Sequence, residues 1–196
     1  MSRHPDKVSD PVGTLRGMTA QPDFPGKLDS AARADPPVVA DERTMLDAYL
    51  DFQRESLALK CADVAGRKHS EKLVPPSGLS LHGLVRHLSG VERWWLHMQF
   101  AGDDVALLYY SDDDPNQDFD SLDGDFDEAL AVWRAQVARS KKIVAAAASL
   151  DDTGTRFADG TAFSLRWVLL RLIAEYARHL GHADLLRERI DGSVGW

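Results

Sequence analysis

Three side chains that can bind a metal ion or transfer a proton lie close together in one segment, 162–191. Glu175, His179 and His182 are spaced by four and three residues, so in a helix they fall within about 60° of one another. The same helical stripe carries apolar residues: Val168, Leu172, Leu186 and Ile190. Such a stripe should face a core, where carboxylate and imidazole groups are costly to bury without partners. Either a metal ion or a hydrogen-bonded polar network would satisfy them.

A second segment, 81–100, carries His87 inside an apolar stripe of its own. The tripeptide at 86–88, Arg-His-Leu, occurs again at 178–180. Two helices that each direct a histidine at a shared core can build a site between them. We therefore expect a divalent metal ion held by His87, Glu175 and His179. His182 would be either a fourth ligand or a hydrogen-bond partner near the site.

The composition limits the classes of function. The chain has 196 residues, a formal net charge of −8 and 44% hydrophobic residues, enough for one core of ordinary size. The negative charge argues against a nucleic-acid partner and against an anionic membrane surface. One cysteine, Cys61, excludes an intrachain disulfide, and no apolar run approaches the length of a membrane span. We expect a soluble cytoplasmic protein with a small-molecule substrate.

Two regions can be distinguished along the chain. Residues 1–40 hold six of the nine prolines and few large apolar residues, which predicts a flexible or extended N-terminal leader. Residues 41–196 show four helical periodicities, beginning near residues 41, 80, 122 and 162. No long stretch alternates with the period of a strand. The pattern predicts an all-α four-helix bundle, in which the long connection before the third helix can serve as a crossover.

Other polar and aromatic residues admit more than one interpretation. Gln53 and Arg54 on the first helix could reach the mouth of the site and bind an anionic substrate group, or they could form structural pairs. Trp94 and Trp95 are interpreted as core residues rather than pocket walls. Arg187 is interpreted as a solvated charge near a helix end.

The residues in two of these helices resemble a known family. The sequence Gly-Leu-Val-Arg-His-Leu-Ser-Gly-Val-Glu-Arg-Trp-Trp at 83–95 looks like the second helix of the DinB-like metal-dependent enzymes. The sequence Glu-Tyr-Ala-Arg-His-Leu-Gly-His-Ala-Asp-Leu-Leu-Arg-Glu at 175–188 looks like the fourth helix of an actinobacterial-type subset of unknown function. The resemblance covers about residues 42–195. It implies a four-helix bundle with a crossover connection.

The resemblance also implies a metal site. The family's usual ligands, one histidine on helix two and two histidines four apart on helix four, fall on His87, Glu175 and His179. The glutamate departs from the all-histidine set and matches the variant in the related mycothiol-dependent maleylpyruvate isomerase. Zinc accepts this set, and nickel or manganese are alternatives. A further departure is Arg171, where the subset has a histidine. Arg171 lies one turn before Glu175, where an ion pair would compete with the metal.

Several functions are compatible with such a site. The resemblance implies a transferase or isomerase in which a low-molecular-weight thiol such as mycothiol reacts with a small electrophile, and a homodimer is common among relatives. A metal-dependent hydrolase using an activated water is a second possibility. A non-catalytic stress or binding protein with a buried His/Glu network is a third. No residue beyond the ligands is assigned a catalytic role.

Overall fold

The computed structural model describes residues 33–154 and 160–194, and most of the predicted leader, 1–32, lies outside them. Four long helices dominate the described residues: α1 (Glu42–Cys61), α2 (Leu81–Glu92), α4 (Phe126–Ala146) and α5 (Leu165–Asp191). The prediction of an all-α four-helix bundle is confirmed. None of the described helices is long and apolar enough to cross a lipid bilayer.

Each long helix begins at a residue whose side chain accepts a hydrogen bond from the first turn, and these residues are Asp41, Ser80, Asp125 and Ser164. Such caps satisfy backbone N–H groups that have no partner within the helix. At the other end of α5, Gly192 adopts a left-handed conformation with φ of 76°, which favours glycine. The caps Asp41 and Ser80 lie where the sequence predicted the first two helices to begin.

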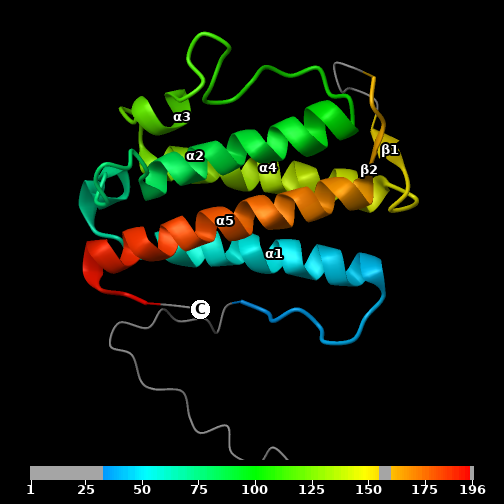
Figure 1. Ribbon diagram of the computed structural model, residues 1–196, viewed down its shortest axis with the longest axis horizontal. Helices are drawn as coiled ribbons and strands as arrows, with labels where there is room; N and C mark the ends of the chain where they lie inside the picture. Colours follow the sequence, from blue (N-terminus) through cyan, green and yellow to red (C-terminus); the bar gives the residue numbers. More distant parts are fainter. Residues whose placement is uncertain (1–32, 155–159, 195–196) are drawn as a thin grey trace, which may run out of the picture.

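The chain order gives a bundle with a crossover (Figure 1). An ion pair between Glu42 and Arg166 joins the starts of α1 and α5, so these two helices run in parallel. The rings of His82 and Phe126 meet near the starts of α2 and α4, which are parallel as well. The chain must therefore return along the bundle between α2 and α4, and residues 101–125 make this crossover.

The core lies where the apolar stripes of the helices meet. The fully buried large side chains come mainly from α1, α2 and α5, and include Leu50, Leu57, Leu84, Leu88, Leu169, Leu172 and Tyr176. A buried polar chain runs among them. Arg54 of α1 pairs with Glu92 of α2, Tyr176 of α5 donates to Glu92, and Trp133 of α4 donates to Tyr176. One network thus connects all four long helices.

Short elements complete the bundle. A π-helical segment, η2 (Arg93–Phe100), continues α2, and the single turn α3 (Gln117–Asp120) lies in the crossover. Two short strands, β1 (Thr153–Gly154) and β2 (Phe163–Ser164), pair antiparallel. These lengths agree with the absence of a long strand pattern in the sequence.

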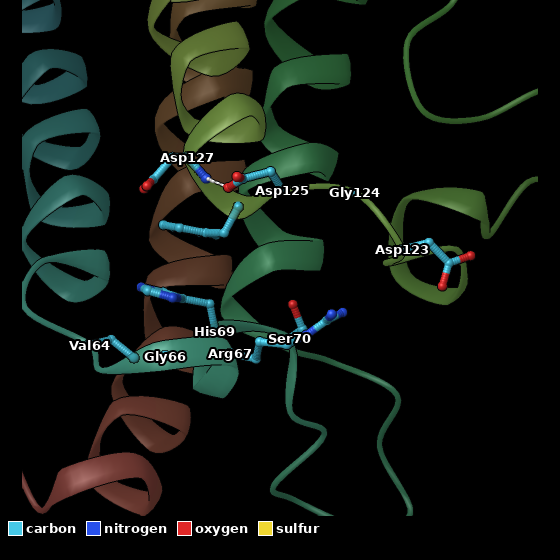
Figure 2. Close-up of a pocket in the computed structure, with 10 residues that line it drawn as sticks. Val64, Gly66, Arg67, His69, Ser70, Asp123, Gly124, Asp125 and Asp127 are labelled. Carbon is cyan, nitrogen blue, oxygen red and sulfur yellow. Dashed lines mark hydrogen bonds between the residues drawn. The ribbon is translucent and has the colours of Figure 1, made fainter.

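A cavity of about 580 Å³ opens at one end of the bundle, between the 3₁₀ helix η1 (Gly66–Ser70) and the start of α4 (Figure 2). The imidazole of His69 stacks on the ring of Phe126, with ring centroids 3.7 Å apart. Nε2 of His69 donates to the carbonyl of Cys61. These groups are therefore engaged in joining η1 to the bundle.

The ends of the helices show details that local patterns did not predict. α1 ends at Cys61, because Ala62 is extended and the side chain of Arg187 donates to the carbonyls of Lys60 and Ala62. Arg187 is 3% exposed, so its interpretation as a solvated charge was wrong. α4 begins at Phe126, after the cap Asp125, rather than near residue 122.

Candidate metal site between α2 and α5

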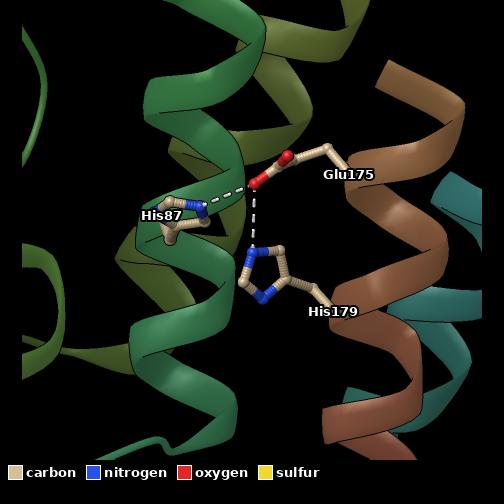
Figure 3. A group of neighbouring side chains, drawn as sticks. All are labelled: His87, Glu175 and His179. Atoms are coloured by element: carbon tan, nitrogen blue, oxygen red, sulfur yellow. Dashed lines mark hydrogen bonds and ion pairs between the residues drawn. The ribbon is translucent and has the colours of Figure 1, made fainter. Parts of the chain in front are cut away.

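The structure brings the three predicted ligands together (Figure 3). His87 projects from α2, and Glu175 and His179 project from α5 toward it. The Oε1 atom of Glu175 lies 3.5 Å from Nε2 of His87 and 3.3 Å from Nε2 of His179. One ligand atom from each residue lies within 4.8 Å of the others. The three side chains are 24%, 12% and 10% exposed, so the cluster is largely withdrawn from water.

The hydrogen bonding of His87 fixes the state of its ring. Nδ1 lies 2.8 Å from Oδ2 of Asp118, a carboxylate oxygen that accepts, so Nδ1 carries the proton and donates. Nε2 then presents a lone pair, and it is buried without a hydrogen-bond partner. It faces Glu175, whose carboxylate can only accept. Two acceptors that face each other in a partly buried place need a cation or a proton between them.

His179 and His182 are hydrogen-bonded to each other beside the Nε2 atom of His87. Nδ1 of His182 lies 3.3 Å from Nδ1 of His179. When Nδ1 of His179 carries the proton and donates to His182, Nε2 of His179 presents its lone pair toward Glu175. His182 is therefore a hydrogen-bond partner of a candidate ligand, one of the two roles that the sequence left open. The three-residue cluster does not include it.

Charges around the cluster favour the protonation states that a metal ion requires. Burial, followed by repulsion from His87, lowers the pKa of His179 to about 4, so its ring is neutral at pH 7. Burial opposes ionisation of Glu175, but its interactions with His179, Arg171 and His87 outweigh burial and lower the pKa of the carboxyl. Neutral imidazoles and an ionised carboxylate are the forms that bind divalent ions.

Arg171 does pair with Glu175, but at the opposite oxygen. Its guanidinium lies 3.4 Å from Oε2, whereas Oε1 faces the two histidines. The guanidinium also lies 5.8 Å from the ring centroid of Trp95. Arg171 therefore holds the carboxylate in an orientation that leaves Oε1 directed at the cluster.

Asp118 was not predicted as a site residue, and the crossover brings it to His87. The guanidinium of Arg86 donates to the carbonyls of Gln117 and Ser121 and so holds both ends of the α3 turn against α2. Gly83 allows the close approach, because a Cβ atom there would lie 2.7 Å from Cδ1 of Phe119. A carboxylate that holds the far nitrogen of a ligating histidine is a common companion of metal sites.

The donor set fits a divalent ion on two grounds. Two imidazoles and a carboxylate form a ligand set that zinc accepts, and the lone pair of His87 has no other partner.

The sequence matches the mycothiol-S-transferase family over residues 45–192. The chain belongs to the mycothiol-S-transferase family. No curated protein and no solved structure matched in the other two comparisons.

The family match covers α2, α4, α5 and all but the first turn of α1, and therefore includes all three residues of the cluster.

Arg54 does not have the substrate-binding role that the sequence offered for it. Arg54, considered as a substrate-binding residue, is 5% exposed, and both its Nε and its Nη2 donate to Glu92, at 2.8 and 2.9 Å. It thus has the structural pairing that the sequence offered as the alternative. Gln53, on the neighbouring position of α1, is half-buried.

A cavity of about 410 Å³ adjoins the candidate site of this mycothiol-S-transferase family member. His87 and Asp118 line it, together with the half-buried rings of Trp94 and Trp95. Trp94 is therefore a cavity wall rather than a core residue, whereas Trp95 both lines the cavity and packs against the core. The cavity at the end of the bundle in Figure 2 has none of the three candidate ligands in its lining.

Proposed function

We propose that the protein is a divalent-metal-dependent S-transferase that joins mycothiol, a low-molecular-weight thiol, to a small electrophile. His87, Glu175 and His179 would hold the metal ion, with zinc the first choice and nickel or manganese the alternatives. The observation that carries this proposal is the convergence of three ligand atoms, one of them the unpartnered Nε2 of His87. The family supports the transferase class and the thiol.

Three protein ligands are the arrangement of catalytic rather than structural zinc sites. A bound divalent ion would supply the positive charge that lowers the pKa of a thiol and so favours the thiolate. Glu175 contributes one negative charge to the centre, and the two neutral imidazoles contribute none. Asp118 keeps the proton of His87 on Nδ1, and His182 can accept the proton of His179 on Nδ1. With this tautomer of His179, both Nε2 lone pairs would be available to the ion, whereas the other tautomer would donate from Nε2 to Oε1 of Glu175.

The proposed transfer balances without an oxidant or a reductant. The S–H bond of the thiol breaks, and its proton passes to solvent. The sulfur lone pair forms a C–S bond with the electrophilic carbon, and the leaving group departs with the electrons of its bond to that carbon. With an unsaturated electrophile, the displaced electron pair instead takes up a proton at the neighbouring carbon.

Metal content tests the first half of the proposal. Protein purified without added metal and then equilibrated with zinc should retain about one ion per chain after dialysis, as measured by mass spectrometry of the elements. His87→Ala and His179→Ala should each lose it, because removing one of three ligands opens the site. His69→Gln, a histidine of η1 outside the cluster, should retain the ion. A wild-type chain that binds no divalent ion, with a melting temperature indifferent to zinc and chelator, would support the non-catalytic bundle.

Thiol transfer tests the second half. The zinc-loaded protein should accelerate the reaction of mycothiol with 1-chloro-2,4-dinitrobenzene, followed by absorbance of the thioether. The His87→Ala variant should lose this acceleration, while His69→Gln should keep it. Release of a phenol from 4-nitrophenyl acetate without any thiol, lost in the same variant, would instead indicate the hydrolase.

We also propose that the protein is cytoplasmic and forms a homodimer. A thiol-dependent enzyme with one buried, free cysteine is suited to the reducing cytoplasm. A homodimer would cover part of the apolar surface that α5 exposes at Trp167, Leu170 and Leu185. Light scattering of the purified protein tests the dimer, and a mass of 21.7 kDa would identify a monomer.

A further inference from the structure

Aromatic residues from two elements meet in the cavity beside His87. Two belong to η2 and two to the crossover: Trp94, Trp95, Tyr110 and Phe119. The crossover packs closely on α2 at this point, because a Cβ atom on Gly90 would be 3.4 Å from Cε1 of Tyr110. The face of an aromatic ring carries a negative potential that attracts cations.

The polar part of the lining adds negative charge and no permanent cation. His87, Asn116 and Asp118 belong to it, and among the described residues no arginine or lysine does. Asp118 is 4% exposed and accepts a hydrogen bond from Nδ1 of His87 at 2.8 Å. The lining therefore contributes one carboxylate beside the aromatic rings.

The crossover that forms one side of the cavity is strongly acidic. Residues 101–125 contain nine aspartates and no arginine, lysine or histidine. Three of these aspartates pair with basic side chains of other elements: Asp103, Asp118 and Asp120. The run Asp112–Asp114 is exposed and forms no ion pair within the part of the chain that the structure describes. Its three charges therefore lie uncompensated beside the residues that line the cavity.

This negative charge reaches the cavity at Tyr110. Burial raises the pKa of Tyr110, and the negative charges of Asp118 and Asp112 raise it further. Arg171 lies 5.8 Å from the ring centroid of Trp95, but its charge is compensated by the ion pair with Glu175 at 3.4 Å. A positive charge in the cavity would thus be attracted both by the rings and by the crossover.

We propose that this cavity selects an electrophile that carries an organic cation, such as a quaternary ammonium group. The identification of the bound molecule as the electrophile rests on the proposed function, whereas the preference for a cation does not. An organic cation fits better than a small hydrated ion, because its apolar surface can pack on the rings while its charge meets their faces. The exposed aspartates would raise the concentration of such a molecule at the mouth of the cavity.

Two unreactive molecules of nearly equal shape isolate the effect of charge. Choline carries a trimethylammonium group, and 3,3-dimethylbutan-1-ol carries a neutral tert-butyl group in its place. Each is titrated into the full chain, without thiol or metal, and followed by ¹H–¹⁵N spectra. We expect choline to bind about tenfold more tightly at low salt and to shift the indole N–H signals of Trp94 and Trp95. Raising the ionic strength to about 0.5 M should reduce this difference, because salt screens the exposed aspartates.

Variants locate the effect in the rings and in the crossover. Trp94→Leu keeps an apolar side chain but removes a ring, and should reduce the preference for choline about threefold or more. Asp112→Asn combined with Asp113→Asn should weaken choline about threefold and leave the neutral alcohol unchanged. Glu55→Gln combined with Glu188→Gln is the matched control. It removes the same charge from exposed positions on α1 and α5, and should change neither affinity.

Equal affinities of the wild-type protein for the two probes at low salt would overturn the proposal. A preference for choline that persists unchanged in both the Trp94 and the aspartate variants would overturn it as well, since choline would then bind elsewhere. Thiol transfer without a preference for choline would refute this inference and leave the proposed function in place. An intact preference in a protein that transfers no thiol would refute the proposed function alone.

Discussion

At the scale of single residues, the candidate site depends on a carboxylate that is not itself a ligand. Removing Asp118 by Asp118→Ala frees the ring of His87 to turn and lets its proton move to Nε2. The affinity for zinc should fall about 10- to 100-fold, measured by competition with a chromogenic chelator. Asp118→Asn keeps an acceptor for Nδ1 and should lose less. Equal losses in the two variants would contradict a role through the hydrogen bond.

Arg171 allows a second prediction at this scale, because its sequence position suggested competition with the metal. The ion pair is at Oε2 and the arginine is about half exposed, so its contribution should be small. Arg171→Ala should therefore change the zinc affinity less than about threefold. A marked gain in affinity in the same competition assay would show that the guanidinium and the ion do compete for Glu175.

At the scale of elements, the approach of the α3 turn to α2 positions Asp118. Gly83→Ala would place a Cβ atom 2.7 Å from Cδ1 of Phe119 and 3.3 Å from its Cα, so the turn must move. We expect a loss of about 1–3 kcal/mol in unfolding free energy, by urea denaturation, together with weaker zinc binding. Gly181→Ala is the matched control. Nothing lies within 4 Å of its Cβ position, and alanine in the middle of α5 should stabilise by up to about 1 kcal/mol.

The same elements show how far the sequence predicts the structure. Helical periodicity placed Glu175 and His179 on one face, and caps such as Ser80 mark helix starts by their own chemistry. Asp118 was not predicted, because its role depends on where a crossover of irregular backbone returns to α2. Arg187 was misread for a related reason. Besides Asp191 one turn further on, its partners are the carbonyls of Lys60 and Ala62 at the end of α1, more than 120 residues away, and no local pattern indicates these two carbonyls.

At the scale of the whole molecule, the buried chain from Arg54 to Trp133 ties the four helices together. Arg54→Met leaves Glu92 buried without its charge partner and should destabilise the fold by about 3–5 kcal/mol. Tyr176→Phe removes one donor to Glu92 and one acceptor for Trp133, and should cost about 1–3 kcal/mol. Urea denaturation of both variants checks the order. If Tyr176→Phe lost more unfolding free energy than Arg54→Met, the ion pair between Arg54 and Glu92 would not be the larger contribution to stability.

Acid should weaken the whole fold through a histidine that the site does not use. His82 is 1% exposed, and Nδ1 lies 2.9 Å from Oγ of Ser70. Burial, followed by repulsion from Arg86, lowers its pKa from 6.5 to about 4. Between these two values the unfolded chain binds more protons than the folded chain, so stability is complete above pH 6.5 and is lost as the pH falls toward 4.

The expected slope from His82 is at most about 1 kcal/mol per pH unit, measured on zinc-free protein by urea denaturation between pH 7 and pH 4.5. His82→Gln can keep a hydrogen bond to Ser70 and cannot take up a proton, so its profile should be flatter over this interval. His179, with its pKa also lowered to about 4, should leave a remaining slope in that variant. Parallel profiles of the wild type and His82→Gln would show that His82 is not held neutral in the folded protein.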